Sequence, residues 1–373
     1  MAGVNAMEKK LAEYKCDTNE AICLKLVRFP EDVDDEGTSF HPEYSHQLYG
    51  DDEVAFGYKG LQIQLYYSAG SLTTLFKVKY SSKVTEKFEC VEPDDVEGKI
   101  REIIPQGFCG NTDDFISLLE KEANFKPFGN LIHTYSIHNE EAGEDITYQI
   151  HKVELASSGF REYHGRLQTF LMWFIETASF IDVDDDRWDF FLVQMLILPP
   201  FQGEGHGAQL LETVHRFYCN SPKVQDITAE DPSENYVKLR DFVLVKLCQA
   251  LQSFSADKIS LGFSEDMAIE AQEKLKINKK HARRVYEILR LRATDMSNEE
   301  VARAYRLEVK KRLFGPYKKN QRELTKMRKC LRPEELASQV SQMDTQLQHE
   351  ELERGYQDVL GEYRRIIERL ARA

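Results

Sequence analysis

The chain has 373 residues, 42% of them hydrophobic, and a net charge of −14 at neutral pH. This length predicts two or three domains with cores of their own, and the negative charge disfavours direct binding of DNA or RNA while favouring a cationic partner. No run of about 18 apolar residues and no signal-peptide core is present, so we expect a soluble protein that is not secreted.

The seven cysteines are scattered and include no Cys-x-x-Cys pair. We therefore expect reduced thiols and no zinc or other metal site. Acidic residues form four runs in the first half of the chain, whereas residues 274–292 and 310–329 are basic. The acidic runs are Glu31–Glu36, Asp51–Glu53, Asp94–Glu97 and Asp182–Asp186. Any one run is most simply a solvated surface, but four together favour a lysine-rich substrate.

Strand patterns dominate the first third of the chain. Residues 21–29 predict a strand, and residues 61–67 and 75–80 alternate with period two around Ser68–Ser71, which predicts a hairpin. Residues 96–104 and 113–122 then have helical spacing. We predict a separate α/β domain over residues 1–125.

A second domain is predicted over residues 126–262. Residues 131–137 and 146–155 form two strands about a polar turn, and an apolar helix follows over 159–180, with Glu176 near its end. After it comes an acidic turn next to Trp188, which is as readily explained as a core aromatic residue as by a binding role.

Helical spacing predominates from residue 277 onwards. Helices are predicted over 279–291, 298–313, 318–331 and 333–373. We predict a helical bundle over 263–332 and a charged helical tail over 333–373, whose coiled-coil-like spacing suggests an accessory or self-associating segment.

The segment Gln194–Val214 predicts a strand, a glycine loop and a helix. Met195–Leu198 form an apolar run typical of a buried strand, and Gly203, Gly205 and Gly207 precede a helical stripe. Glycines let backbone N–H groups approach a phosphate at a helix N-terminus. His206-Gly207-Ala208 replaces the Gly-Lys-Ser/Thr of a nucleotide-hydrolysing loop, and the dinucleotide Gly-x-Gly-x-x-Gly spacing is absent. A glycine turn without a ligand is the plainer alternative.

The spacing Gln202-x-x-Gly205-x-Gly207 matches the acetyl-coenzyme A loop of the Gcn5-related N-acetyltransferase superfamily. Further motifs along the chain resemble the family of type B histone acetyltransferase catalytic subunits: Phe160–His164, Arg166–Phe180, Pro200–Val214, Asp226–Ser233, His281–Arg290 and the Asp51–Glu53 turn. The resemblance covers nearly the whole chain. It implies an α+β architecture with an N-terminal α/β domain, a central acetyltransferase fold and a C-terminal helical domain.

The same resemblance implies ligands and partners. Acetyl-coenzyme A would bind Met195, Leu196, Ile197, Gln202, Gly203, Glu204, Gly205, His206, Gly207 and Ala208. The tail of newly synthesised histone four, and to a lesser extent of histone two-A, would bind Asp51, Asp52, Glu53 and Trp188 before chromatin assembly. The expected partner is a WD-repeat histone chaperone of the retinoblastoma-binding type, and the expected location is nucleus and cytoplasm.

Acetyl transfer to lysine needs a general base, because the ammonium must lose a proton before its nitrogen can attack the thioester. We assign this role to Glu230, with Asp231 and Glu176 as neighbours able to share it. Asp231 is explained equally well as the N-cap of a helix whose first residue is Pro232. Tyr236 could return a proton to the thiolate, although a buried core tyrosine is the simpler explanation.

The chain departs from the family between Val193 and Gln194, where the family has a further stretch of roughly thirty to forty residues, enough for two strands. Here two strand segments are fused into one about 36 Å long, unusual for a compact domain. We infer a splice form or an incomplete gene model. The alternative to an active enzyme is a catalytically impaired protein that binds only histone or chaperone.

Overall fold

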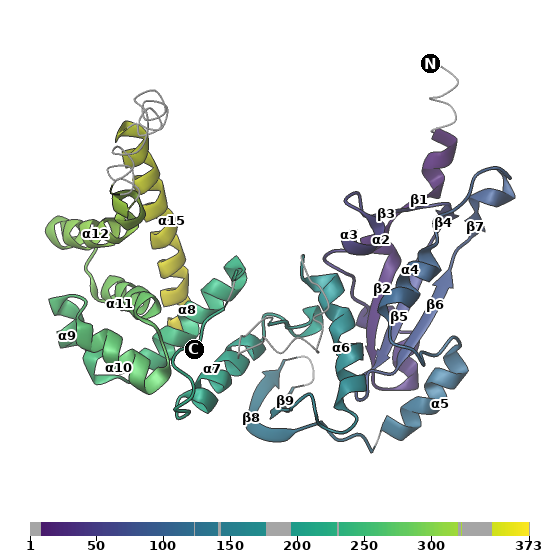
Figure 1. Ribbon diagram of the computed structural model, residues 1–373, viewed down its shortest axis with the longest axis horizontal. Coiled ribbons are helices and arrows are strands. Elements are labelled where there is room, and N and C mark those ends of the chain that lie inside the picture. The colour runs from purple at the N-terminus through teal and green to yellow at the C-terminus, as the bar shows by residue number, and fades with distance from the viewer. Residues whose placement is uncertain are drawn as a thin grey trace. The chain divides into compact units, whose positions relative to one another are not determined.

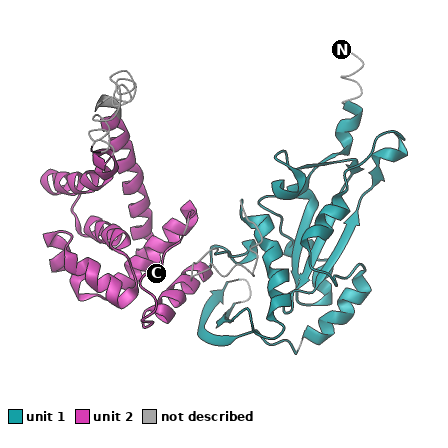
Figure 2. Ribbon diagram, viewed as in Figure 1, with its two compact units in different colours: residues 1–189, 194–204 teal, residues 190–193, 205–373 magenta. Residues whose placement is uncertain are grey.

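The computed structural model describes residues 9–122, 124–140, 143–176, 195–229, 231–319, 322 and 345–372 (Figure 1). The chain divides into two compact units, residues 1–189 with 194–204 and residues 190–193 with 205–373 (Figure 2). All the strands described belong to the first unit, and the second is helical. This confirms the predicted α+β class. The four predicted domains, 1–125, 126–262, 263–332 and 333–373, stay a prediction beside this division.

The first unit contains short strands and helices in an irregular order. The strands are β1 (Lys15–Asp17), β2 (Ile22–Val27), β3 (Val54–Phe56), β4 (Tyr58–Lys59), β5 (Gln62–Ser68), β6 (Thr74–Lys79), β7 (Ser82–Lys83), β8 (Asn130–Asn139) and β9 (Glu144–Lys152). The α-helices are α2 (Thr18–Ala21), α3 (His46–Tyr49), α4 (Val96–Ile103), α5 (Thr112–Glu122) and α6 (Phe160–Phe174). The 3-10 helices are η1 (Ala12–Tyr14), η2 (Pro30–Val33), η3 (Glu36–Thr38), η4 (Val84–Glu86) and η5 (Pro199–Phe201).

A three-stranded sheet in the order β2-β5-β6 forms the centre of the first unit. β2 pairs parallel to β5, with Ile22 opposite Ile63, and β5 pairs antiparallel to β6. The predicted strand and the predicted hairpin are therefore confirmed. Alternate residues point to opposite faces of the sheet, so that α4 and α6 cover one face and α5 covers the other.

Helix α6 is held to the sheet by aromatic side chains. Phe170, Trp173 and Phe174 lie in the same core as Ile22 and Ile63, and Trp173 is fully buried. Burial of each large side chain contributes roughly 1.5–3 kcal/mol. The helix ends at Phe174 rather than at the predicted residue 180, because Ile175 has extended backbone angles, φ −130 and ψ 115.

Strands β8 and β9 pair antiparallel with each other, as predicted, and form a separate two-stranded sheet. Tyr135 lies opposite Tyr148 with the two rings stacked at 5.6 Å, and Ile137 lies opposite Ile146. Aromatic and aliphatic pairs across strands stabilise a hairpin by roughly 0.2–1 kcal/mol each.

The second unit is built from helices that pack around α8 and α11. They are α7 (His206–Tyr218), α8 (Glu234–Cys248), α9 (Ala256–Leu261), α10 (Glu265–Leu275), α11 (Lys279–Ala293), α12 (Glu299–Leu313) and α15 (Thr345–Arg372), with the 3-10 helix η6 (Gln252–Phe254). Asn278 and Asn298 accept N–H hydrogen bonds at the starts of α11 and α12. These caps explain why the predicted helices over 279–291 and 298–313 are confirmed.

The C-terminal helix α15 is part of this bundle, so the expectation of an accessory or self-associating tail is wrong for the residues described. Tyr356, Leu360, Tyr363 and Ile366 are buried. The helical spacing of these residues agrees with the prediction. Their apolar stripe is buried within the same chain, because α15 packs on α8, α11 and α12.

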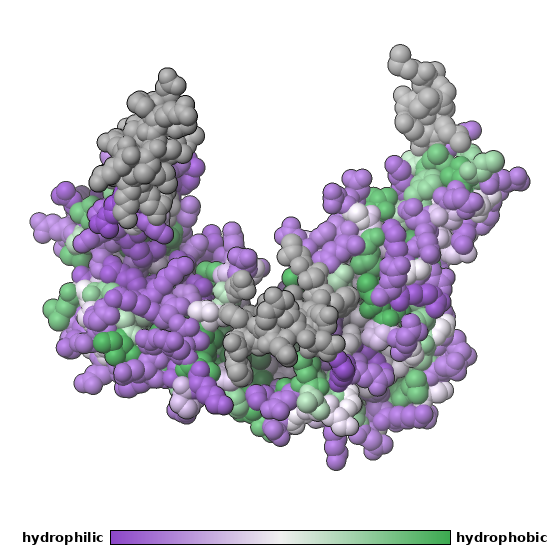
Figure 3. Space-filling model, viewed as in Figure 1, coloured by the Kyte–Doolittle hydropathy of each residue, from purple (hydrophilic) through white to green (hydrophobic). Residues whose placement is uncertain are grey.

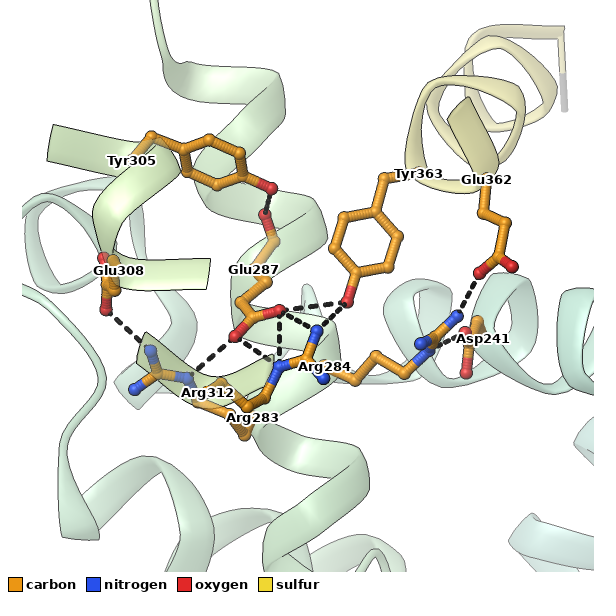
Figure 4. Close-up of polar contacts among 9 residues, drawn as sticks. All are labelled: Asp241, Arg283, Arg284, Glu287, Tyr305, Glu308, Arg312, Glu362 and Tyr363. Carbon is orange, nitrogen blue, oxygen red and sulfur yellow. Dashed lines mark hydrogen bonds and ion pairs between the residues drawn. The ribbon is translucent and has the colours of Figure 1, made fainter. Parts of the chain in front are cut away.

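A network of buried charges joins α15 to these helices (Figure 4). The Glu287 carboxylate of α11 is 1% exposed and accepts hydrogen bonds from Arg312 of α12 at 2.8 Å and from the Tyr363 hydroxyl of α15 at 3.0 Å. On the neighbouring turn, Arg284 joins Asp241 of α8 to Glu362 of α15. Removing Glu287 would leave the partly buried Arg312 without its carboxylate partner.

His281 on α11 makes the second unit sensitive to acid. Burial, with a contribution from nearby Arg240, lowers the pKa of His281 to about 4, and its Nδ1 has no hydrogen-bond partner among the residues described. The unfolded chain then binds this proton more readily than the folded chain does. We expect the resulting stability to be complete above pH 6.5 and to be lost, by roughly 3 kcal/mol, as the pH falls towards 4.

The measurement is the free energy of unfolding of the second unit, followed by circular dichroism in denaturant at several pH values. His281→Leu should flatten the pH dependence between these limits. An equally steep dependence in the variant would assign the acid sensitivity to other groups.

The surface seen in Figure 3 is mainly hydrophilic, with hydrophobic residues scattered among charged ones. Such scatter is ordinary for a protein surface. Among the described residues, none of the helices has the length and apolar character needed to cross a membrane.

Candidate functional site

The turn that carries Asp51, Asp52 and Glu53 joins α3 to β3. Both aspartates are exposed, but Glu53 turns inwards at φ 51 and its carboxylate accepts from the backbone N–H groups of Ser45 and His46 at 2.7 and 3.0 Å. Asn19 donates to its second oxygen at 2.7 Å. Partial burial alone would raise the pKa of Glu53, but these hydrogen bonds outweigh it and hold the pKa below its usual value. Glu53 therefore shapes the turn, and the aspartates face solvent.

Glu176 lies beside this turn, two residues beyond the end of α6. Its backbone oxygen accepts from Nε2 of His46 at 2.8 Å and from Nε2 of Gln47 at 3.3 Å. The structure thus brings together two groups of predicted residues that are more than 120 positions apart. Sequence reasoning missed His46 and Gln47, because a polar pair in a four-residue helix carries no pattern of its own.

The segment Met195–Leu198 is not a strand, which corrects the prediction. These residues are half-buried, and Leu196 and Leu198 pack against the core that contains Ile22 and Ile63. Leu198 has φ −62 and ψ 146. An apolar run of four residues does not distinguish a strand from other buried segments. Pro199 also restricts the residue before it to an extended conformation.

The glycine loop follows η5 and leads directly into α7, as predicted. Gln202 donates from its Nε2 to the Ile197 oxygen at 2.8 Å, and both residues belong to the first unit. Gly203 and Gly205 have φ +86 and +98, and a Cβ atom at either would meet no described residue within 4 Å. Open space beside left-handed glycines at a helix start suits a pyrophosphate. The start of α7 is spanned by Glu204, Gly205, His206, Gly207 and Ala208.

Gly207 offers the cleaner test of this loop. Gly205 has a left-handed φ, so a side chain there adds backbone strain of roughly 1–2 kcal/mol, whereas Gly207 lies inside α7 and is not left-handed. We expect Gly207→Leu to abolish acetyl-coenzyme A binding, measured by calorimetry, while the circular dichroism spectrum stays unchanged. Unchanged affinity would refute the assignment of the loop.

The predicted base residues are only partly described. Glu230 and Trp188 lie outside the described residues, so their roles stay predictions. Asp231 is exposed with φ 38, and the helix that follows is capped by Ser233, whose hydroxyl accepts from the Tyr236 N–H at 3.2 Å. Asp231 is therefore not the N-cap, and Pro232 is not the first helical residue. The capping explanation for Asp231 is wrong, because α8 begins only at Glu234 and Ser233 supplies its cap.

Tyr236 occupies the first turn of α8 and is half-buried. Burial raises the pKa of its hydroxyl, and the nearby Arg240 opposes this only in part. A phenol with a raised pKa keeps its proton at neutral pH. Tyr236 is thus in the protonation state that a proton donor requires.

Two family models match the chain: "Histone acetyl transferase HAT1 N-terminus" over residues 14–176 and "Histone acetyltransferase type B catalytic subunit, C-terminal" over residues 240–291. The histone acetyltransferase type B catalytic subunits of Mus musculus and Homo sapiens are each 63% identical to it, over 98% of this chain and 97% and 96% of their own lengths. A fungal relative with the same name, from Cryptococcus neoformans, is 28% identical over 97% of this chain.

The alignments also bear on the predicted internal gap. The alignment with the mouse relative spans 402 positions, 29 more than the 373 residues of this chain. At least that many aligned positions therefore have no residue here. The place of the gap, predicted between Val193 and Gln194, lies outside the described residues.

Proposed function

This chain belongs to the family of histone acetyltransferase type B catalytic subunits, and on that basis we propose that it acetylates lysines in the N-terminal tail of newly synthesised histone four, and to a lesser extent of histone two-A, before chromatin assembly. It is a histone acetyltransferase, and the family implies acetyl-coenzyme A as the co-substrate. What we propose beyond this is which histones are the substrates, which residue is the general base and which protein is the partner.

The distribution of charge is the observation that carries the choice of a cationic tail. Residues 1–204 contain 37 Asp and Glu against 18 Lys and Arg, a net charge of −19, whereas residues 205–373 contain 26 against 31, a net charge of +5. The exposed Asp51 and Asp52 and the neighbouring exposed Glu176 lie within the acidic part. Potentials of opposite sign speed encounter and favour a lysine-rich peptide over other partners.

The proposed chemistry is direct transfer. Acetyl-coenzyme A supplies an activated acetyl thioester, and residues 195–197 and 202–208 would hold it. Glu230 takes the proton from the lysine ammonium, with Asp231 and Glu176 able to share the role, and the neutral amine attacks the carbonyl carbon. Tyr236 can protonate the departing thiolate. No metal takes part in this scheme.

We further propose that a WD-repeat histone chaperone of the retinoblastoma-binding type presents the histone, and that the protein works in both nucleus and cytoplasm. Newly synthesised histones are made in the cytoplasm and used in the nucleus, which supports both locations. Co-purification of tagged protein with such a chaperone tests the partner, and loss of the acidic turn should leave that association unchanged.

A second candidate, a catalytically impaired histone- or chaperone-binding protein, is favoured by the aligned positions that this chain lacks. A thermal-shift titration with acetyl-coenzyme A separates the two. Ligand at 100 times its Kd should stabilise an intact coenzyme site by about 2.7 kcal/mol. A melting temperature that does not move would favour the impaired protein.

A further inference from the structure

The imidazole of His46 lies between the Asp51–Glu53 turn and the backbone of Glu176. Its Nε2 is 2.8 Å from the Glu176 carbonyl oxygen, and its Nδ1 is 3.5 Å from Oε1 of Glu53. The same Glu53 oxygen accepts from the backbone N–H of His46. One side chain therefore contacts both segments to which the proposed function assigns the histone lysine.

The end of α6 explains why donors gather here. The last carbonyl groups of a helix have no partner within it and must find donors elsewhere. The Glu43 and Tyr44 N–H groups donate to the Trp173 oxygen at 2.9 and 3.0 Å, and Nε2 of His46 donates to the oxygen of Glu176, three residues further along the chain. The loop before α3 thus fixes the direction in which the chain leaves α6.

The His46 ring is itself restrained. Tyr44 lies edge-on to it, with the ring centroids 5.8 Å apart and an angle of 77° between the planes. The imidazole is 28% exposed, and the contacts with Tyr44, Glu53 and Glu176 hold the ring in place. Rotation of the ring would break the contact with Glu176 and the contact with Glu53 together.

We propose that His46 is a positioning residue for acetyl transfer: it holds the Glu176 backbone at a fixed distance from the turn that carries Asp51 and Asp52. The inference rests on the proposed function, in which Glu176 shares the role of base and the turn binds the tail. His46 acts through these groups and does not itself exchange a proton with the substrate. A displacement of about 1 Å at a reacting group can cost up to about a hundredfold in rate.

The test compares His46→Ala with His41→Ala in the full chain. His41 is a matched control, because it lies in the loop before α3 and its Nδ1 contacts the backbone oxygen of Ile22, in β2, at 2.8 Å. With a histone four tail peptide, we expect His46→Ala to lower kcat about tenfold, with the KM for acetyl-coenzyme A and the melting temperature equal to those of His41→Ala. A kcat equal to that of the unsubstituted chain would overturn the inference.

A double-mutant cycle separates positioning from a general loss of structure. If His46 acts through Glu176, then adding His46→Ala to Glu176→Gln should cause no further loss of kcat. The same tenfold loss in both backgrounds would overturn the inference. His46→Gln should recover part of the rate, since an amide can still donate to the Glu176 oxygen.

The proposed function can fail separately. If the unsubstituted chain acetylates no histone peptide, the proposed activity is wrong for this chain, and His46 is then judged by the affinity of the full chain for the same peptide, measured by calorimetry. Weaker binding by His46→Ala than by His41→Ala would still support the positioning role. Equal affinities would overturn it.

Discussion

Glu230→Gln should lower the turnover of histone-peptide acetylation by about 10² to 10⁴ while leaving acetyl-coenzyme A affinity nearly unchanged. Glutamine keeps the size of the side chain and its hydrogen bonding but removes the basic oxygen. Raising the pH should partly rescue the variant, because more of the free lysine arrives neutral as the pH approaches its solution pKa of about 10.4. Steady-state kinetics over a range of pH measure both effects.

Asp231→Asn is the companion variant. Asp231 is exposed and caps no helix, and asparagine tolerates its left-handed backbone angles, so stability should change by about 0.5 kcal/mol or less. A fall in turnover without a fall in stability would show that Asp231 shares the proton. If Glu230→Gln keeps full activity while Glu176→Gln loses it, the base is Glu176. Where this chain shows no turnover, restoring the missing aligned residues at the gap predicted after Val193 supplies the reference enzyme.

Glu287→Ala should destabilise the second unit by about 3–5 kcal/mol. The carboxylate is 1% exposed and pairs with Arg312 and Arg283, so that its removal leaves the partly buried Arg312 guanidinium without its carboxylate partner, while Arg283 keeps its ion pair with Glu308. It also removes the acceptor of the Tyr363 hydroxyl and so loosens α15. The measurement is denaturant unfolding of the full chain, followed by circular dichroism.

Glu265→Ala is the matched control, because Glu265 and its partner Lys279 are 63% and 62% exposed. A surface pair of this kind contributes about 1 kcal/mol or less. Tyr363→Phe should cost about 1 kcal/mol, the usual value of one hydrogen bond. Equal losses in Glu287→Ala and Glu265→Ala would contradict a special role for the buried network.

Local pattern was enough for several elements. The alternation of residues 61–67 and 75–80 predicted the β5–β6 hairpin, and helical spacing predicted α11 and α12. The order of glycines predicted the loop before α7, and Gly203 and Gly205 take left-handed angles in it. In each case the hydrogen bonds that define the element join residues close together in the chain.

Tertiary structure decided the features that depend on distant partners. The Glu53 carboxylate accepts from Ser45, 8 positions away, and His46 contacts the Glu176 oxygen, 130 positions away. Tyr363 of the buried helix α15 donates to Glu287, 76 positions away. Ser233 rather than Asp231 caps α8, and capping preference alone does not separate the two, since Ser and Asp are both favoured N-cap residues. Sequence by itself determined the family, the class of fold and the local elements. Packing between elements decides which polar side chains bond within the protein and which face a substrate. The periodicity of a local segment does not encode that packing.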